Sequence, residues 1–215
     1  MHYTSVLFDL DGTLLDTLGD LTAAMNRTLT RHGLPERTRQ QMRAALGNGA
    51  RRLMELSIPA GTDSALFETL LAEYNADYAA HCRIETAPYP GVAALLLKLH
   101  AQGRKLAIVS NKPDEAVRAL RAEFFADTVP IAVGEKQGIR RKPAPDTLLT
   151  AMAQLGADPA STVYVGDSEV DIATARAAGL PCISVLWGFR DRDVLEQAGA
   201  QQFAADADEL ARLLD

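Results

Sequence analysis

The chain has 215 residues, of which 47% are hydrophobic and 23% are charged, and its formal net charge is −6 at pH 7. This composition is typical of a globular protein of one or two domains, and the negative charge gives no electrostatic reason to expect nucleic acid or an anionic membrane as a partner. The two cysteines lack metal-ligand spacing, no apolar run is long enough to cross a bilayer, and the N-terminus does not resemble a signal peptide. We therefore expect a reduced, cytoplasmic protein.

The first predicted element is a buried strand that ends in acids. Val6, Leu7 and Phe8 are apolar, and they lead directly into Asp9-Leu10-Asp11-Gly12-Thr13. Because side chains two apart on an extended chain point the same way, we expect Asp9 and Asp11 to face one small space. Two adjacent carboxylates repel each other, and a divalent cation, a shared proton or a cationic group would relieve that cost.

The next segment, residues 16–82, has the apolar spacing of helices and contains no convincing strand. Glycine and proline residues divide it into four predicted helices, the last of them capped by Thr62 or Asp63. The segment is far longer than one connection between strands requires. We therefore predict an α/β core, residues 1–15 and 83–215, with a helical cap inserted at residues 16–82.

Beyond residue 88 the chain alternates between predicted strands and predicted helices. The strands are expected at 106–109, 129–133, 163–165, 182–185 and 202–204. This alternation predicts a Rossmann-like, doubly wound parallel sheet, whose ligands bind beyond the carboxyl ends of the strands. Ser110, Asp167 and the loop residue Lys142 fall at those ends, as Asp9 does.

These side chains together favour phosphate chemistry. Three carboxylates without nitrogen ligands suit a hard cation such as Mg²⁺, and Lys142 with Ser110 suits an anion. A carboxylate facing a metal-held phosphate can act as a nucleophile. A second carboxylate two residues further on can protonate the leaving alcohol and then deprotonate water.

Four short motifs, in this order along the chain, resemble those of the haloacid dehalogenase superfamily of phosphohydrolases. They are Asp9 to Leu14, Ser110-Asn111, Lys142 in Arg-Lys-Pro-Ala-Pro-Asp, and Gly166 to Asp171. The resemblance implies a Mg²⁺-dependent phosphomonoester hydrolase that acts through an aspartyl phosphate. It also implies that the helical insert is the small cap that this superfamily places after its first motif.

The same resemblance implies roles for single residues. Asp9 would be the nucleophile and Asp11 the general acid and base, while Ser110 and Lys142 would hold the phosphoryl group. The Asp9 side chain, the Asp11 backbone carbonyl and Asp167 would bind Mg²⁺. Thr13 and Asn111 would bind the substrate. Asp171 would support the metal ligands without binding Mg²⁺ directly.

Two segments resemble the phosphoglycolate phosphatase branch of the superfamily, Leu46 to Ala50 and Val185 to Phe189. This resemblance indicates a small anionic phosphate ester, such as 2-phosphoglycolate, as the substrate. In the predicted cap, glycines expose backbone amides at a helix N-terminus, where an anion is favoured. We expect Gly49 and Arg52 to bind the substrate there, and prefer Arg52 over its neighbour Arg51.

Several other functions fit part of the pattern. A dehalogenase would need neither metal nor phosphate ligands, and Asp11, Thr13 and Asp167 argue against it. A phosphosugar mutase shares all four motifs, and pyrophosphatases of the same superfamily share similar segments. A phosphate-binding regulatory protein on this scaffold is the non-enzymatic alternative.

Overall fold

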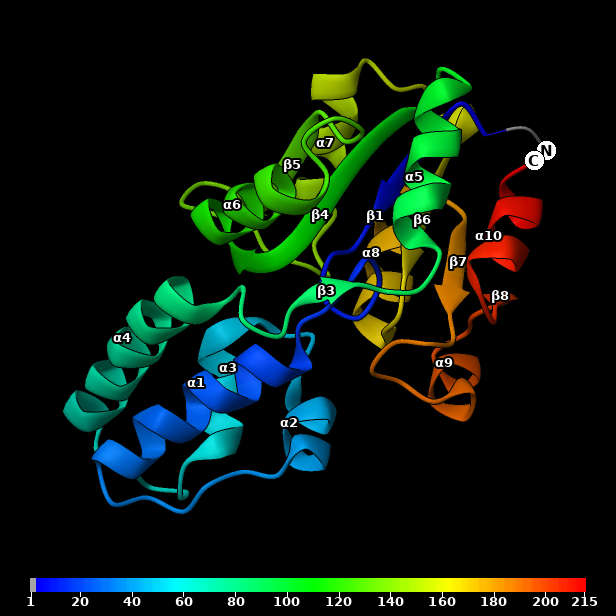
Figure 1. Cartoon of the computed structure of the whole chain (residues 1–215). Coiled ribbons are helices and arrows are strands. Elements are labelled where there is room, and N and C mark those ends of the chain that lie inside the picture. The colour runs from blue at the N-terminus through cyan, green and yellow to red at the C-terminus, as the bar shows by residue number, and fades with distance from the viewer. Residues whose placement is uncertain (1–2) are drawn as a thin grey trace. The chain divides into compact units, whose positions relative to one another are not determined.

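The structure is a computed structural model that describes residues 3–215 (Figure 1). It divides into two compact units. The α/β unit runs to Leu15 and resumes from Pro88 to Asp215, and the helical unit comprises Asp16–Ala87. Within residues 3–215, no helix combines the length and the apolar character needed to span a membrane.

A six-stranded sheet forms the centre of the α/β unit, in the order β5-β4-β1-β6-β7-β8. Its strands are β1 (Ser5–Phe8), β4 (Lys105–Pro113), β5 (Ile131–Glu135), β6 (Thr162–Gly166), β7 (Cys182–Val185) and β8 (Gln202–Ala204). All neighbouring strands pair in parallel, as the alternating sequence pattern predicts. Every residue of β1 is buried, because this strand lies between β4 and β6.

Helices connect these strands and cover the sheet. They are α5 (Val92–Ala101), α6 (Asp114–Phe124), α7 (Asp146–Leu155), α8 (Glu169–Ala178), α9 (Arg192–Gln197) and α10 (Ala207–Leu214), with a short 3₁₀ helix at Pro159–Ser161. One apolar cluster packs Leu148 and Met152 of α7 against Leu7, Val109 and Tyr164 of three adjacent strands. The predicted α/β class is therefore confirmed, although α9 was not expected from the sequence.

The strand β4 extends further than its apolar run predicts. It continues to Pro113, and its register with β5 shifts between Val109 and Pro113. An irregularity of this kind re-aims side chains at the end of a strand. The shift brackets Ser110 and Asn111, so both polar residues lie in a strand and not in the loop that follows it.

The helical unit contains α1 (Leu18–Arg31), α2 (Arg39–Ala45), α3 (Gly49–Ser57) and α4 (Ser64–His81). Side chains cap two of these helices. Thr38 and Gln41 form a reciprocal capping box at the start of α2, and Asp63 accepts hydrogen bonds from two backbone amides of α4.

The chain crosses between the two units at β2 (Leu15–Asp16) and β3 (Ala87–Pro88), which form a small two-stranded sheet. The segment that precedes β3 is held by the buried carboxylate of Asp20 in α1, which accepts hydrogen bonds from the backbone amides of Ile84, Glu85 and Thr86 at 2.9–3.0 Å. Residues 83–87 therefore belong to the helical unit, whereas the predicted cap ends at Cys82.

Candidate active site

Three buried carboxylates meet at the carboxyl ends of β1 and β6. Oxygen atoms of Asp9, Asp167 and Asp171 all lie within 4.8 Å of one another. Asp9 directly follows β1, where its backbone amide donates to the Val165 carbonyl at 2.9 Å. Asp167 follows β6, and Asp171 lies in the first turn of α8. The parallel pairing of β1 with β6 thus brings together acids that are about 160 residues apart in the chain.

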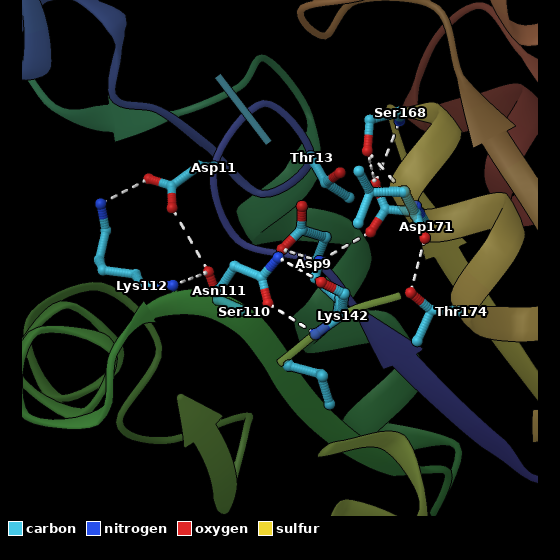
Figure 2. A network of polar contacts seen from close by, with 12 residues as sticks. Asp9, Asp11, Thr13, Ser110, Asn111, Lys112, Lys142, Ser168, Asp171 and Thr174 are labelled. Carbon is cyan, nitrogen blue, oxygen red and sulfur yellow. Dashed lines mark hydrogen bonds and ion pairs between the residues drawn. The ribbon is translucent and has the colours of Figure 1, made fainter. Parts of the chain in front are cut away.

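Lys142 supplies the positive charge in this cluster (Figure 2). Its Nζ lies 2.9 Å from Asp9 Oδ1 and 2.7 Å from Asp171 Oδ1, and the side chain is 2% exposed. Burial disfavours the charged amine, but the two carboxylates outweigh that cost and raise the pKa of Lys142 above its usual value. Lys142 is therefore protonated at neutral pH.

Asn111 holds the Lys142 loop in place. Its side-chain amide donates to the Lys142 carbonyl at 3.0 Å, and its side-chain oxygen accepts from the Lys142 backbone amide at 2.8 Å. These two bonds link the end of β4 to the loop after β5, although the residues are separated by 31 positions. They tie the Lys142 backbone to the end of β4. Substrate binding by Asn111 stays a prediction.

Asp171 is satisfied by bonds to the protein. Its Oδ2 accepts from the Ser168 hydroxyl at 2.6 Å and from the backbone amides of Asp167 and Ser168, and its Oδ1 binds Lys142 and the Tyr164 hydroxyl. Burial alone would raise the pKa of Asp171, but Lys142 and these hydrogen bonds hold it below its usual value. Asp171 is therefore an ionised anchor for the lysine.

Asp9 and Asp167 have raised pKa values, in contrast to Asp171. Burial raises the pKa of Asp9 well above its usual value, against the opposing charge of Lys142. Burial and the charge of Asp171 raise the pKa of Asp167 to about 7. The two oxygens of Asp167 accept from the Thr13 hydroxyl at 3.0 Å and from the Phe189 backbone amide at 2.8 Å. Without a further positive charge, this site does not readily hold every carboxylate in its ionised form.

Asp11 does not face the same space as Asp9. Its carboxylate pairs with Lys112 Nζ at 2.9 Å and accepts from the Ser110 hydroxyl at 3.4 Å, and it lies apart from the three clustered acids (Figure 2). The two-residue alternation fails because β1 ends at Phe8 and the chain turns immediately afterwards, with Gly12 at a φ of +85°. The extended geometry that the alternation requires has ended before Asp11.

The donor set fits a hard divalent cation. Its donors are carboxylate oxygens in a buried space, with hydroxyls and backbone carbonyls nearby, and such oxygen donors suit Mg²⁺ better than Zn²⁺. A cation at this position would also oppose the effects of burial and of the neighbouring acids, which raise the pKa values of Asp9 and Asp167. The acidic cluster is therefore a candidate metal site.

The remaining predicted residues belong to the helical unit. Gly49 is the first residue of α3, with a φ of +78°, and Arg52 lies one turn further on and pairs with Glu55 at 2.9 Å. Arg51 forms two hydrogen bonds with Glu68 and lies over the Phe67 ring. The roles of Gly49 and Arg52 in substrate binding stay predictions.

Two residues of the site were not anticipated from the sequence, Tyr164 and Lys112. Tyr164 lies within an apolar strand, where a phenol hydroxyl needs a buried partner, and this need was the available signal. Lys112 follows Ser110 and Asn111 directly, but its pairing with Asp11 depends on how the chain turns after β1.

Comparisons with known proteins agree with this geometry. Residues 6–185 match the family model of haloacid dehalogenase-like hydrolases. A phosphoglycolate phosphatase of Xanthomonas campestris pv. campestris is 36% identical over 187 residues, covering 86% of this chain and 84% of that protein. An N-acetylmuramic acid 6-phosphate phosphatase of Pseudomonas aeruginosa is 34% identical over 190 residues, covering 88% of this chain and 84% of that protein.

Solved structures show the same fold. A protein of Lactobacillus delbrueckii subsp. bulgaricus superimposes with a TM-score of 0.94 at 36% sequence identity, covering 100% of this chain and 99% of the other. A hydrolase from Pseudomonas syringae gives a TM-score of 0.81 at 25% identity, covering 99% and 98% of the two chains. The chain belongs to the haloacid dehalogenase-like hydrolase family. It is a phosphatase that acts on small phosphate esters, as its four motifs predict.

Proposed function

We propose that this phosphatase is a Mg²⁺-dependent phosphomonoester hydrolase that forms a phosphoryl-aspartate on Asp9. The observation that carries the proposal is the position of Asp9: its carboxylate is buried at the end of a central strand, beside Lys142 and Asp167. A phosphoryl group placed there would meet a nucleophile, a fixed cation and candidate metal ligands together.

The proposed reaction has two halves. An Asp9 oxygen attacks phosphorus and forms a new O–P bond, while the bond to the leaving alcohol breaks and Asp11 gives that alcohol a proton. Asp11 then takes a proton from water, whose oxygen attacks the same phosphorus and releases inorganic phosphate from Asp9. Because Asp11 pairs with Lys112 in the structure, its side chain must leave that ion pair to reach the leaving group.

Charge compensation has two sources in this proposal. Lys142 and the Ser110 hydroxyl bind phosphoryl oxygens, and the lysine offsets charge that develops as the phosphoryl group is transferred. Mg²⁺, when bound by the Asp9 side chain, the Asp11 carbonyl and Asp167, would keep the nucleophile ionised and neutralise phosphate charge. Asp171 binds Lys142 from the opposite side and keeps it in place.

We further propose that the substrate is a small phosphate ester that carries a carboxylate, such as 2-phosphoglycolate. The relatives support this choice, because both phosphoglycolate and N-acetylmuramic acid 6-phosphate are acids that bear a phosphate ester. Gly49 and Arg52 are the candidates for binding the carboxylate. Phosphosugar mutase, pyrophosphatase and phosphate-binding regulatory activities are the alternatives that the test below must separate.

The test measures phosphate release from 2-phosphoglycolate, N-acetylmuramic acid 6-phosphate, pyrophosphate, a sugar monophosphate and an aryl phosphate, each with and without Mg²⁺. We expect Mg²⁺-dependent hydrolysis with the highest kcat/KM on a carboxylated ester. Asp9→Asn should abolish turnover, because an amide cannot form the phosphoryl-aspartate, and it should keep the fold.

The matched control is Asp127→Asn, an exposed aspartate of the same unit, which should retain full activity. Wild-type turnover by Asp9→Asn would exclude the proposed nucleophile. An isomerised sugar phosphate as the main product would favour a mutase, and the absence of hydrolysis of every ester would contradict the proposed function as a whole.

A further inference from the structure

The Tyr164 hydroxyl is a polar group in an otherwise apolar layer. Tyr164 is the middle residue of β6, its side chain is fully buried, and its ring packs in the cluster that contains Leu7, Val109 and Met152. Packing alone would favour phenylalanine at this position, because a buried hydroxyl must be compensated by a hydrogen bond. A tyrosine at this position is therefore accounted for by the hydrogen-bond partners of its hydroxyl.

Those partners are the charged groups of the site. The Tyr164 hydroxyl accepts a hydrogen bond from Lys142 Nζ at 3.0 Å and donates one to Asp171 Oδ1 at 2.9 Å. Burial raises the pKa of Tyr164 well above its usual value, so the group stays a neutral hydroxyl that accepts and donates at the same time. It joins the lysine to the carboxylate that anchors it.

The hydroxyl is also a hydrogen-bond acceptor of the lysine, together with Asp171. An ammonium group has three N–H donors and no acceptor. Lys142 Nζ donates to Asp171 Oδ1 at 2.7 Å and to the Tyr164 hydroxyl at 3.0 Å, and it forms an ion pair with Asp9 Oδ1 at 2.9 Å. Because the Tyr164 hydroxyl also donates to Asp171 Oδ1 at 2.9 Å, the ammonium, the carboxylate and the hydroxyl form one closed triangle, and the hydroxyl ties the lysine to its anchor.

We propose that Tyr164 is a positioning residue for Lys142: its hydroxyl, fixed by the apolar core, holds the ammonium in the orientation that serves phosphoryl transfer. This inference rests on the proposed function, in which Lys142 offsets charge on the transferring phosphoryl group. Tyr164 itself contacts neither substrate nor metal in the proposal. It acts through Lys142 and Asp171, and it connects the packing of the sheet to the geometry of the site.

The test is Tyr164→Phe, which removes the hydroxyl and keeps the ring. We expect kcat for an aryl phosphate to fall about 10-fold, close to the lower limit for a lost hydrogen bond to a charged group. The KM should change by less than about twofold, because a misplaced ammonium weakens the transition state more than substrate binding. The control is Tyr3→Phe, a buried tyrosine before the opposite end of β1, which should leave both constants unchanged.

A double-substitution cycle shows whether the effect passes through the lysine. In a Lys142→Met background, Tyr164→Phe should change kcat by less than about twofold, because the lysine through which the hydroxyl acts is already absent. A full additional loss in that background would overturn the proposal, and so would a kcat for Tyr164→Phe equal to that of Tyr3→Phe. If Lys142→Met does not fold or has no measurable turnover, the comparison of Tyr164→Phe with Tyr3→Phe decides alone.

Different results would contradict the proposed function and the positioning role of Tyr164. A Lys142→Met enzyme with wild-type kcat would remove the lysine from the proposed function, and the positioning role of Tyr164 with it. A large loss in Lys142→Met together with an unaffected Tyr164→Phe would leave the proposed function intact and overturn only the inference about Tyr164. All rates are compared well below the melting temperature of each variant, so that unfolding does not contribute.

Discussion

Asp9 and Asp11 are separated by a single leucine, yet they occupy different electrostatic environments. The Asp9 carboxylate is buried against Lys142, and burial raises its pKa. The Asp11 carboxylate is 18% exposed and pairs with Lys112. Two carboxylates in different environments can take the separate roles of nucleophile and general acid. The difference arises because one residue directly follows a central strand and the other lies in the turn after it.

Asp11→Asn separates these roles experimentally. The substitution keeps the backbone carbonyl but removes the proton that the leaving alcohol receives, and general acid catalysis is typically worth about 10²–10⁴-fold. We expect a loss in that range for the phosphorylation step with alkyl phosphates. The loss should be much smaller with aryl phosphates, whose leaving groups need less protonation. Single-turnover kinetics on both substrate types provide the measurement, and equal losses on both would show that Asp11 is not the general acid.

At the scale of secondary structure, one buried aspartate joins α1 to α4. The Asp77 side chain is 2% exposed and accepts hydrogen bonds from Arg27 Nε at 2.8 Å and Arg31 Nη2 at 3.0 Å, from two arginines one turn apart on α1. Burial alone would raise the pKa of Asp77, but the arginines outweigh it and hold that pKa below its usual value. The pair of helices is therefore stabilised most when Asp77 is ionised.

We expect Asp77→Asn to lower the free energy of unfolding of the helical unit by about 1–3 kcal/mol at neutral pH. The partial exposure of the two arginines limits this loss, because water screens their interaction with Asp77. A group whose folded pKa is lowered stabilises the protein above its unfolded pKa and loses this effect as the pH falls through the folded pKa. The difference between wild type and Asp77→Asn should therefore shrink below about pH 4. Urea denaturation followed by circular dichroism measures it, with Asp127→Asn as control, and a difference that does not change with pH would contradict the assignment.

At the scale of the whole chain, we expect the acidic cluster to couple metal binding to stability. Asp9 and Asp167 come from distant segments, and their raised pKa values show that the fold holds these acids at an electrostatic cost. The folded pKa of Asp167 is about 7. Between about pH 4 and about pH 7, the folded state therefore keeps a proton on Asp167 that the unfolded state has released. The stability contribution of this group therefore falls as the pH rises from about 4 to about 7 in metal-free protein.

Mg²⁺ should reverse that loss. We expect the rise in Tm on adding Mg²⁺ to be larger at about pH 8 than at about pH 5.5, because the cation binds the ionised carboxylate and competes with the proton. Chelation should remove both the added stability and the activity, and Ca²⁺ should stabilise the protein but support turnover poorly. Thermal melts of wild type and Asp167→Asn give the measurement. Full activity after exhaustive chelation, or equal Mg²⁺ shifts at both pH values, would contradict this prediction.

The fold class and much of the site could be predicted from local patterns. Apolar runs such as Val6 to Phe8 mark the strands, and alternation with helices implies a parallel sheet. Because the carboxyl ends of parallel strands lie at one edge, polar residues at or just after those ends fall near each other, and this rule alone predicts the placement of Asp9, Ser110 and Asp167. The family and the phosphatase activity, predicted from the four motifs, are confirmed by the comparisons.

Other features depend on contacts between distant parts of the chain, and only the tertiary structure decides them. The orientation of Asp11 depends on the turn after β1 and on Lys112, about 100 positions away in the chain. The proposed role of Tyr164 in β6 depends on a lysine in the loop after β5, and the extension of the helical unit to Ala87 depends on Asp20. Local patterns report which side chains are apolar and which end a strand. Which charges pair in the site follows from packing, because those partners are brought together only when the sheet and its loops assemble.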